Sequence, residues 1–272
     1  MTKIRTIDDP NYVHHQYQNA SNLNVRIALH EKFSTNPYRW QHWLFDQIHL
    51  TAPCRVLELG CGAGNFWMEN IDRVPHGLDV TLSDASEGML DQTRRNLGEK
   101  AGLFRFEVID AQSIPYAAGT FDAVLACHML YHVPDRAKAI SEIRRVLKPD
   151  GVLYATTASH QNLKEIATLL KGYEEMLSAW RSSAVEGFSV ETGLDQLKRN
   201  FADVEVIRYH DALEVTDAQM LADYLLSGRI ELPGERREEF IQYVHQELER
   251  QGGCFHITKE AGLLIARGIA AG

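Results

Sequence analysis

The feature that most restricts the fold of this chain is a dense run of glycines directly after a short apolar segment. Residues 55–59 are largely apolar, and Gly60, Gly62 and Gly64 follow them in the pattern GxGxG. Glycine permits tight turns with positive φ and lets the backbone approach a ligand closely, because it has no Cβ. A strand that runs into such a loop and then into a helix is typical of nucleotide-binding α/β proteins. The pattern therefore predicts a ligand site built largely from main-chain atoms.

Short apolar segments recur along the chain and alternate with amphipathic stretches. Segments that are hydrophobic on both faces are typical of central strands in a parallel sheet covered by helices on both sides. The intervening stretch 136–147 places Ile140, Ile143 and Val146 on one side, as an amphipathic helix does. We expect seven strands, at residues 55–59, 78–83, 104–109, 121–126, 151–157, 204–209 and 262–267.

Helical patterns outside this alternation predict two further parts of the chain. Residues 1–50 are expected to form an N-terminal helical cap, in which Trp40 and Trp43 share one apolar face. Residues 51–272 are expected to form the main domain, with a late helical insertion around 161–200 and 217–250. The predicted fold class is therefore α/β, with a doubly wound, mostly parallel, seven-stranded Rossmann-like sheet.

An acid beside the glycine loop indicates which ligand the loop holds. Glu58 stands two residues before Gly60, and Asn65 occupies the position where the dinucleotide fingerprint GxGxxG has its third glycine. A carboxylate is a poor partner for a pyrophosphate, but it suits a ligand that carries an ammonium and a sulfonium. These two features favour S-adenosylmethionine over a nicotinamide dinucleotide.

Polar residues also stand at the ends of the next three predicted strands. Asp84 follows the second strand, where a carboxylate can accept hydrogen bonds from both ribose hydroxyls. Asp110 follows the third strand and can accept a hydrogen bond from an adenine amino group. His128 follows the fourth, where the methyl donor and its acceptor are expected to meet. Open α/β sheets bind ligands at the carboxyl ends of their strands, so these residues are expected to share one site.

The stretch from about Arg55 to Thr157 resembles the class I S-adenosylmethionine-dependent methyltransferases, and most closely the small-molecule branch that contains ubiquinone and menaquinone methyltransferases. The motifs that carry the resemblance are Glu58–Gly64, Asp84, Asp110-Ala111, Ser113–Tyr116 with Phe121-Asp122, and Leu147–Gly151. The resemblance implies a Rossmann-like methyltransferase fold with S-adenosyl-L-methionine as cofactor. It also implies a cofactor-binding set of Glu58, Gly60, Cys61, Gly62, Asp84, Ala85, Asp110, Ala111 and His128.

The expected chemistry is in-line transfer of a methyl group, which mainly requires alignment of the acceptor and exclusion of water. A general base is needed only where the acceptor must lose a proton. His132 and His128 are the candidates for this catalytic role, because imidazole titrates near neutral pH. The two histidines stand four residues apart, but without a third nearby ligand this spacing is a weak metal signal, so no metal is expected.

Charge and cysteine content restrict the partners. A formal net charge of −9 argues against binding along a nucleic-acid backbone, which requires clusters of Lys and Arg. The four cysteines form no CxxC pair, and the polar N-terminal stretch lacks the apolar core of a secretion signal, so a cytoplasmic protein is expected. No apolar run is long enough to cross a bilayer. The expected partner is a small-molecule methyl acceptor, with neither nucleic acid nor membrane involved.

Two alternative functions are compatible with a Rossmann-like core. One is an NAD(P)-dependent oxidoreductase, which the GxGxG spacing and Glu58 disfavour. The other is a catalytically silent module that binds S-adenosylmethionine for regulation. This fold hosts many chemistries, so the sequence leaves open the acceptor, the atom that is methylated and the oligomeric state.

Overall fold

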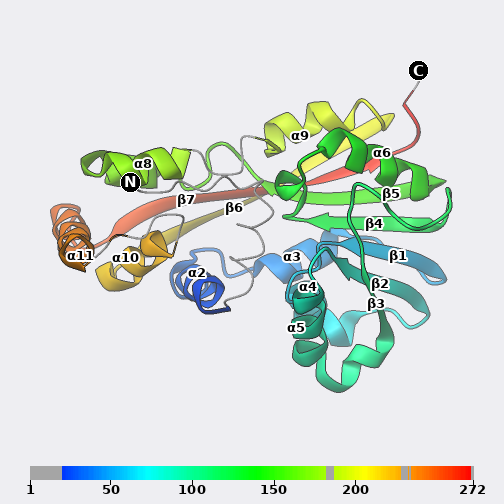
Figure 1. Cartoon of the computed structure of the whole chain (residues 1–272), viewed down its shortest axis with the longest axis horizontal. Helices are drawn as coiled ribbons and strands as arrows, with labels where there is room; N and C mark the ends of the chain where they lie inside the picture. Colours follow the sequence, from blue (N-terminus) through cyan, green and yellow to red (C-terminus); the bar gives the residue numbers. More distant parts are fainter. Residues whose placement is uncertain (1–19, 182–186, 228–231, 233, 271–272) are drawn as a thin grey trace. The chain divides into compact units, whose positions relative to one another are not determined.

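The computed structural model describes residues 20–181, 187–227, 232 and 234–270, and its central element is a seven-stranded sheet (Figure 1). The strand order is β3-β2-β1-β4-β5-β7-β6, with β1 to β5 parallel and β7 antiparallel to β5. The strands are β1 Cys54–Leu59, β2 Leu78–Asp84, β3 Phe104–Val108, β4 Phe121–Cys127, β5 Leu147–Ala158, β6 Asp203–Val215 and β7 Phe255–Arg267. The predicted doubly wound, mostly parallel, seven-stranded sheet is confirmed.

The described helices follow the predicted alternation and then continue into the late part of the chain. They are α2 Ala20–Phe33, α3 Trp40–Gln47, α4 Asn65–Asn70, α5 Glu87–Leu97, α6 Arg136–Val146, α7 Lys164–Leu169, α8 Glu174–Arg181, α9 Val190–Leu197, α10 Ala218–Leu226 and α11 Gly234–Arg250. Short 3₁₀ turns are η1 Ile71–Arg73, η2 Gly98–Leu103, η3 Leu130–His132 and η4 Leu170–Gly172. No helix among these described residues is long and apolar enough to cross a membrane.

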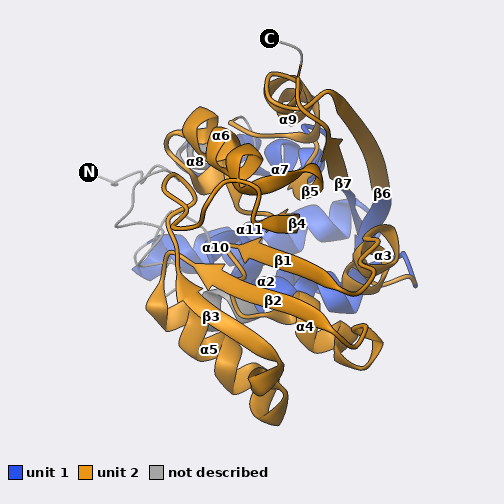
Figure 2. Cartoon of the chain, turned by 90° about the vertical axis from the view of Figure 1, so that its right-hand side faces the viewer, with its two compact units in different colours: residues 1–37, 160–186, 210–260 blue, residues 38–159, 187–209, 261–272 orange. Residues whose placement is uncertain are grey.

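Contacts within the chain divide it into two compact units (Figure 2). The sheet unit comprises residues 38–159, 187–209 and 261–272, and the second unit comprises 1–37, 160–186 and 210–260. Helix α3 belongs to the sheet unit and α2 to the second unit. This division does not coincide with a cap over residues 1–50, of which 1–19 lie outside the described residues, and the domain boundaries stay a prediction.

Helices cover both faces of the sheet unit. Leu57 and Val124 pack with residues of α6 and α9, whereas Val56 and Leu125 pack with residues of α3, α4 and α5. Because successive strand residues point to opposite faces, neighbours in the sequence belong to different apolar clusters. The continuous apolar runs in the sequence are therefore those of strands buried on both sides.

The last two strands are longer than the sequence pattern predicts. Strand β6 continues to Val215 rather than ending at Tyr209, and β7 begins at Phe255 rather than at Gly262. Polar residues such as His210 and Asp211 interrupt the apolar pattern and resemble a turn. Strand β5 likewise begins at Leu147 rather than at Gly151.

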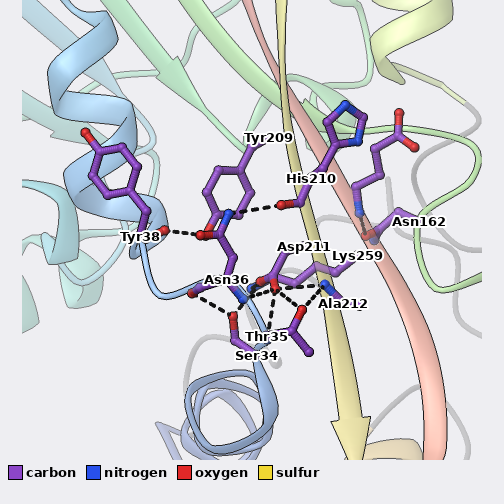
Figure 3. Close-up of polar contacts among 11 residues, drawn as sticks. Ser34, Thr35, Asn36, Tyr38, Asn162, Tyr209, His210, Asp211, Ala212 and Lys259 are labelled. Carbon is purple, nitrogen blue, oxygen red and sulfur yellow. Dashed lines mark hydrogen bonds and ion pairs between the residues drawn. The ribbon is translucent and has the colours of Figure 1, made fainter.

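A buried carboxylate explains why the polar segment of β6 remains in a strand (Figure 3). The Asp211 side chain is shielded from solvent and accepts hydrogen bonds from Ser34 Oγ at 2.7 Å and from the Asn36 N–H at 3.0 Å. Lys259 Nζ lies 3.0 Å from the same carboxylate. Burial by itself raises the pKa of Asp211, but the bonds from Ser34 and Lys259 and the Lys259 charge outweigh it and lower that pKa.

We expect Asp211→Asn to lower the free energy of unfolding at pH 7 by about 2–3 kcal/mol, because Lys259 loses its counterion in a largely dry environment. A lowered pKa means that ionised Asp211 stabilises the fold at neutral pH, and that this contribution is lost as the pH falls through the ordinary value of 3.8 and below. Urea unfolding at pH 7 and pH 3 measures both effects. The control is Asp223→Asn, which alters an exposed pair with Arg237 and should change stability by less than about 1 kcal/mol. Equal losses at pH 7 would contradict the role assigned to Asp211.

Candidate active site

The strand register brings the predicted site residues to one edge of the sheet. Leu59 of β1 lies opposite Ser83 of β2, and Asp84 lies opposite Val108 at the end of β3. Parallel strands end at the same edge, so the loops that follow β1, β2 and β3 are neighbours. This edge carries Glu58, the glycine loop, Asp84 and Asp110 as the sequence predicts.

Two glycines of the loop after β1 are required by close packing as well as by backbone geometry. Gly60 has φ of 67°, and a Cβ there would lie 2.8 Å from Met129 Cβ. Gly64 has φ of 77°, and a Cβ there would lie 2.5 Å from Thr93 Cγ2. Side chains at either position would both strain the backbone and collide with a neighbour. The loop is therefore held close to the segment after β4 and to helix α5.

The glycine loop is also tied to strand β2 by its own N–H groups. The Cys61 N–H donates to the Ser83 carbonyl at 2.8 Å, and the Gly62 N–H donates to Asp84 Oδ2 at 3.0 Å. The Cys61 carbonyl accepts a hydrogen bond from the Gly64 N–H, and the Cys61 side chain lies in an apolar cluster. Cys61 thus supports the loop, and a direct cofactor contact by this residue stays a prediction.

Glu58 lies buried next to the loop, with 2% of its surface exposed. Its Oε2 accepts a hydrogen bond of 2.7 Å from the indole Nε1 of Trp67, which lies in helix α4. Burial raises the pKa of Glu58 from the ordinary value of 4.5 to about 7; the Trp67 bond opposes this rise and the Asp84 charge adds to it. A buried carboxyl group with this single hydrogen bond from the described residues retains capacity to accept bonds from a cationic ligand.

Asp84 ends β2 with its carboxylate turned toward the loop and toward helix α5. Oδ2 accepts the Gly62 N–H, and Oδ1 accepts the Ser86 N–H at 2.9 Å. Ser86 occupies the N-cap position of α5, and its side chain forms no capping hydrogen bond. Burial raises the pKa of Asp84, while the bonds from Ser86 and Gly62 oppose that rise. A carboxylate can accept about four hydrogen bonds, so the bonds from Ser86, Gly62 and Ala85 leave capacity for a ribose hydroxyl.

Asp110, predicted to bind adenine, is exposed and already engaged by a neighbour. Its Oδ1 accepts the Gln112 N–H at 2.8 Å, and the Gln112 side-chain amide lies 3.0 and 3.1 Å from its two oxygens. The side-chain oxygen Oε1 of Gln112 in turn accepts the Asp135 N–H at 3.0 Å. Ala111 is buried, whereas Ala85 is exposed directly after Asp84. Gln112 therefore competes for the carboxylate that the sequence assigns to adenine.

His128 follows β4 in an unusual backbone conformation. Its φ is 51°, and its N–H donates to the Thr156 carbonyl at 3.0 Å and to Thr156 Oγ1 at 3.1 Å. Its ring lies 5.3 Å from the Trp40 ring and 6.4 Å from the Tyr131 ring. Strained residues of this kind are concentrated at functional sites, where the surrounding structure imposes the conformation.

His132 ends the 3₁₀ turn η3, one turn after His128. Its N–H donates to the Met129 carbonyl at 2.9 Å, and its ring lies 4.5 Å from that of Tyr131. Tyr131 thus contacts both predicted catalytic histidines. In the described part of the chain, no group of three or more His, Cys, Asp or Glu residues could hold a metal ion.

Several residues that shape the site carry no recognisable signal in the sequence. Trp67 of α4 contacts Glu58 of β1, and Thr93 and Asn96 of α5 contact the glycine loop, only through tertiary packing. Tyr209 of β6 packs edge-on against Trp40 at 5.2 Å, far from it in sequence. A buried Trp requires a partner for its single N–H, but only the structure shows that Trp67 is buried.

The residues present fit S-adenosylmethionine on physical grounds. Glu58, a buried and only partly satisfied carboxyl group, suits the ammonium group at the amino-acid end of that molecule. The glycine loop permits close approach of the backbone, and Asp84 retains acceptor capacity for a sugar.

Comparison with known proteins agrees with this geometry. The model of the family described as a methyltransferase domain matches residues 57–155. A ubiquinone biosynthesis O-methyltransferase of Thiobacillus denitrificans is 31% identical over 57% of this chain and 72% of its own length. The chain spans only 47–59% of the length of the first four curated relatives that it matches.

Solved structures share the fold at low sequence identity. The cyclase SpnF has a TM-score of 0.57 at 18% identity and covers 97% of this chain and 98% of its own. Phosphoethanolamine N-methyltransferase 2 of Haemonchus contortus, in complex with S-adenosyl-L-methionine, has a TM-score of 0.56 at 17% identity, over 96% of this chain and 59% of its own. Together with the matching motifs and the seven-stranded sheet, these findings show that the chain belongs to the class I S-adenosylmethionine-dependent methyltransferases of the small-molecule branch, as the resemblance in its sequence predicts.

Proposed function

We propose that this protein transfers the methyl group of S-adenosylmethionine to a small-molecule acceptor. The observation that carries the proposal is the buried Glu58 carboxyl group beside the glycine loop, with Trp67 as its one hydrogen-bond partner among the described residues. S-adenosylmethionine supplies an activated methyl group for in-line transfer, so the protein needs mainly to bind, orient and exclude water. The net charge of −9 supports a small-molecule acceptor over a nucleic acid, and four free thiols support a cytoplasmic location.

The proposed roles follow the order of the strands. Glu58 and the main chain of Gly60 and Gly62 face the amino-acid end of the cofactor, and Asp84 accepts the ribose hydroxyls. Asp110 and Ala111 meet the adenine, once the Gln112 amide turns aside from the carboxylate. Cys61 and Ala85 flank these contacts, and His128 lies beside the reacting end.

The first test compares ligands of the two competing cofactor classes. S-adenosylhomocysteine should raise Tm, with a stabilisation of about 2.7 kcal/mol at one hundred times its Kd, whereas NAD should not. Asp84→Asn should weaken S-adenosylhomocysteine binding about a hundredfold in calorimetry, because it removes charged acceptors from the ribose. Asp91→Asn on the exposed side of α5 is the matched control and should leave the Kd unchanged. Stabilisation by NAD alone would support the oxidoreductase instead.

A second test uses the titration of Glu58. Its raised pKa means that folding favours the protonated group, so stability without ligand falls as pH rises from about 4.5 to about 7, by at most about 3 kcal/mol. The ammonium group that S-adenosylhomocysteine carries favours the ionised form of Glu58, so the affinity for this ligand should rise with pH up to about 7 and then level off. Calorimetry of Glu58→Gln should give weaker binding with no such rise. A wild-type Kd that is constant from pH 5.5 to 8 would exclude this role for Glu58.

A third test separates binding from methyl transfer. His132 and His128 are the proposed general bases for an acceptor that must lose a proton. With methyl-labelled cofactor and fractionated metabolites, His132→Gln should lower the rate of transfer about a hundredfold without changing the Kd for S-adenosylhomocysteine. His128→Gln should change both, because His128 also belongs to the proposed cofactor set. Tight binding without labelled product in any fraction would favour a silent binding module. A protein with this fold need not be named for methyl transfer, since SpnF, which shares the fold, is named as a cyclase.

A further inference from the structure

Helix α5 holds the glycine loop through two side chains that point at consecutive carbonyl groups. Thr93 Oγ1 donates to the Gly62 carbonyl at 2.6 Å, and Asn96 Nδ2 donates to the Ala63 carbonyl at 2.9 Å. Thr93 is fully buried, so its hydroxyl cannot exchange this bond for one with water. Two consecutive main-chain carbonyls of the loop are therefore held by one helix.

Thr93 acts on the loop in two ways. Its hydroxyl has one proton and lies 2.6 Å from the Gly62 carbonyl oxygen but 3.0 Å from that of Met89 in its own helix, so the loop is the closer acceptor. Its methyl group packs where a side chain at Gly64 would stand. The hydroxyl therefore sets the orientation of one peptide group, and the methyl sets how near the loop comes.

The amide of Asn96 is itself held in place along the helix. Gln92 Nε2 donates to Asn96 Oδ1 at 2.8 Å, and an Arg95 guanidinium nitrogen donates to Gln92 Oε1 at 2.9 Å. With its oxygen occupied by Gln92, Asn96 presents its NH₂ group to the Ala63 carbonyl. The chain of bonds from Arg95 to Ala63 fixes that orientation.

These bonds decide which way the loop N–H groups point. In a planar trans peptide the C=O and the following N–H point in opposite directions. When Thr93 holds the Gly62 carbonyl toward α5, the Ala63 N–H must point away from α5. The Gly62 N–H is directed to Asp84 Oδ2, the carboxylate assigned to the ribose. Helix α5 thus orients the peptide groups on both sides of Ala63, and Asp84 at the end of β2 holds the peptide group before Gly62.

We propose that Thr93 and Asn96 are positioning residues for S-adenosylmethionine, which set its affinity through the Gly62–Ala63 and Ala63–Gly64 peptide groups without touching the cofactor. The inference rests on the proposed function, because it assumes that the loop binds this cofactor. A loop that is oriented before binding loses less freedom when the ligand arrives, and affinity rises accordingly.

The test compares two substitutions, each of which removes one of the two groups on Thr93 Cβ. Thr93→Val keeps the shape and removes the hydroxyl, and it should raise the Kd for S-adenosylhomocysteine roughly tenfold. Thr93→Ser keeps the hydroxyl and removes the methyl, and its Kd should stay within about threefold of the wild type. Calorimetry gives the Kd, and urea unfolding of the same samples gives stability. Both variants are expected to lose stability, so the rescue of binding by serine separates positioning from folding.

A substitution of Asn96 provides a second, independent test. Asn96→Asp keeps the size but replaces the NH₂ group with an acceptor facing the Ala63 carbonyl, so the Kd should rise at least tenfold. Asp91→Asn, on the exposed part of the same helix, is the control and should bind like the wild type. If Thr93→Val binds as tightly as the wild type, or if Kd follows stability across all four variants, the inference is wrong. If the wild type itself binds no S-adenosylhomocysteine, the proposed function fails first.

Discussion

The hydrogen bond from the Gly62 N–H to Asp84 joins the two loops on which the candidate site depends. It acts together with the bond from Cys61 to Ser83, and both exist only because β1 and β2 pair in parallel and end at the same level. A carboxylate that accepts main-chain N–H groups orients a loop more firmly than a neutral acceptor does. The glycine loop is therefore a fixed part of the sheet edge, and its geometry is set before any ligand arrives.

Glu58, which stands in β1 just before the glycine loop, is a buried acid with one side-chain hydrogen bond among the described residues. An ionised carboxylate with few partners is costly inside a protein, and the raised pKa of Glu58 expresses that cost. Replacing the Trp67 bond with several donors would stabilise the fold but would also use up the capacity of the group to accept a cation. Functional sites commonly retain such unfavourable groups, which the rest of the structure must offset.

The second unit also contains a buried carboxylate, but this one is fully partnered. Asp211 is also shielded from solvent, but Ser34, Asn36 and Lys259 satisfy it, and its pKa is lowered rather than raised. A fully partnered buried carboxylate is structural, whereas an incompletely partnered one retains capacity to bind. Within a single chain, Asp211 is thus a fully partnered buried acid, whereas Glu58 is a buried acid that retains acceptor capacity.

The sequence by itself determined the class of fold and the order of the site along the chain. Periodicity predicted the five parallel strands, because strands buried on both faces are continuously apolar, and the GxGxG run located the loop after β1. Only the tertiary structure decided which side chains hold that loop. Thr93 and Asn96 contact the glycine loop, and Trp67 contacts Glu58, only because the folded chain packs their helices there. The polar end of β6 likewise contains Asp211, whose partner Lys259 lies 48 positions away in the sequence. Local patterns encode periodicity and turn chemistry, whereas contacts between distant residues form only when the chain has folded.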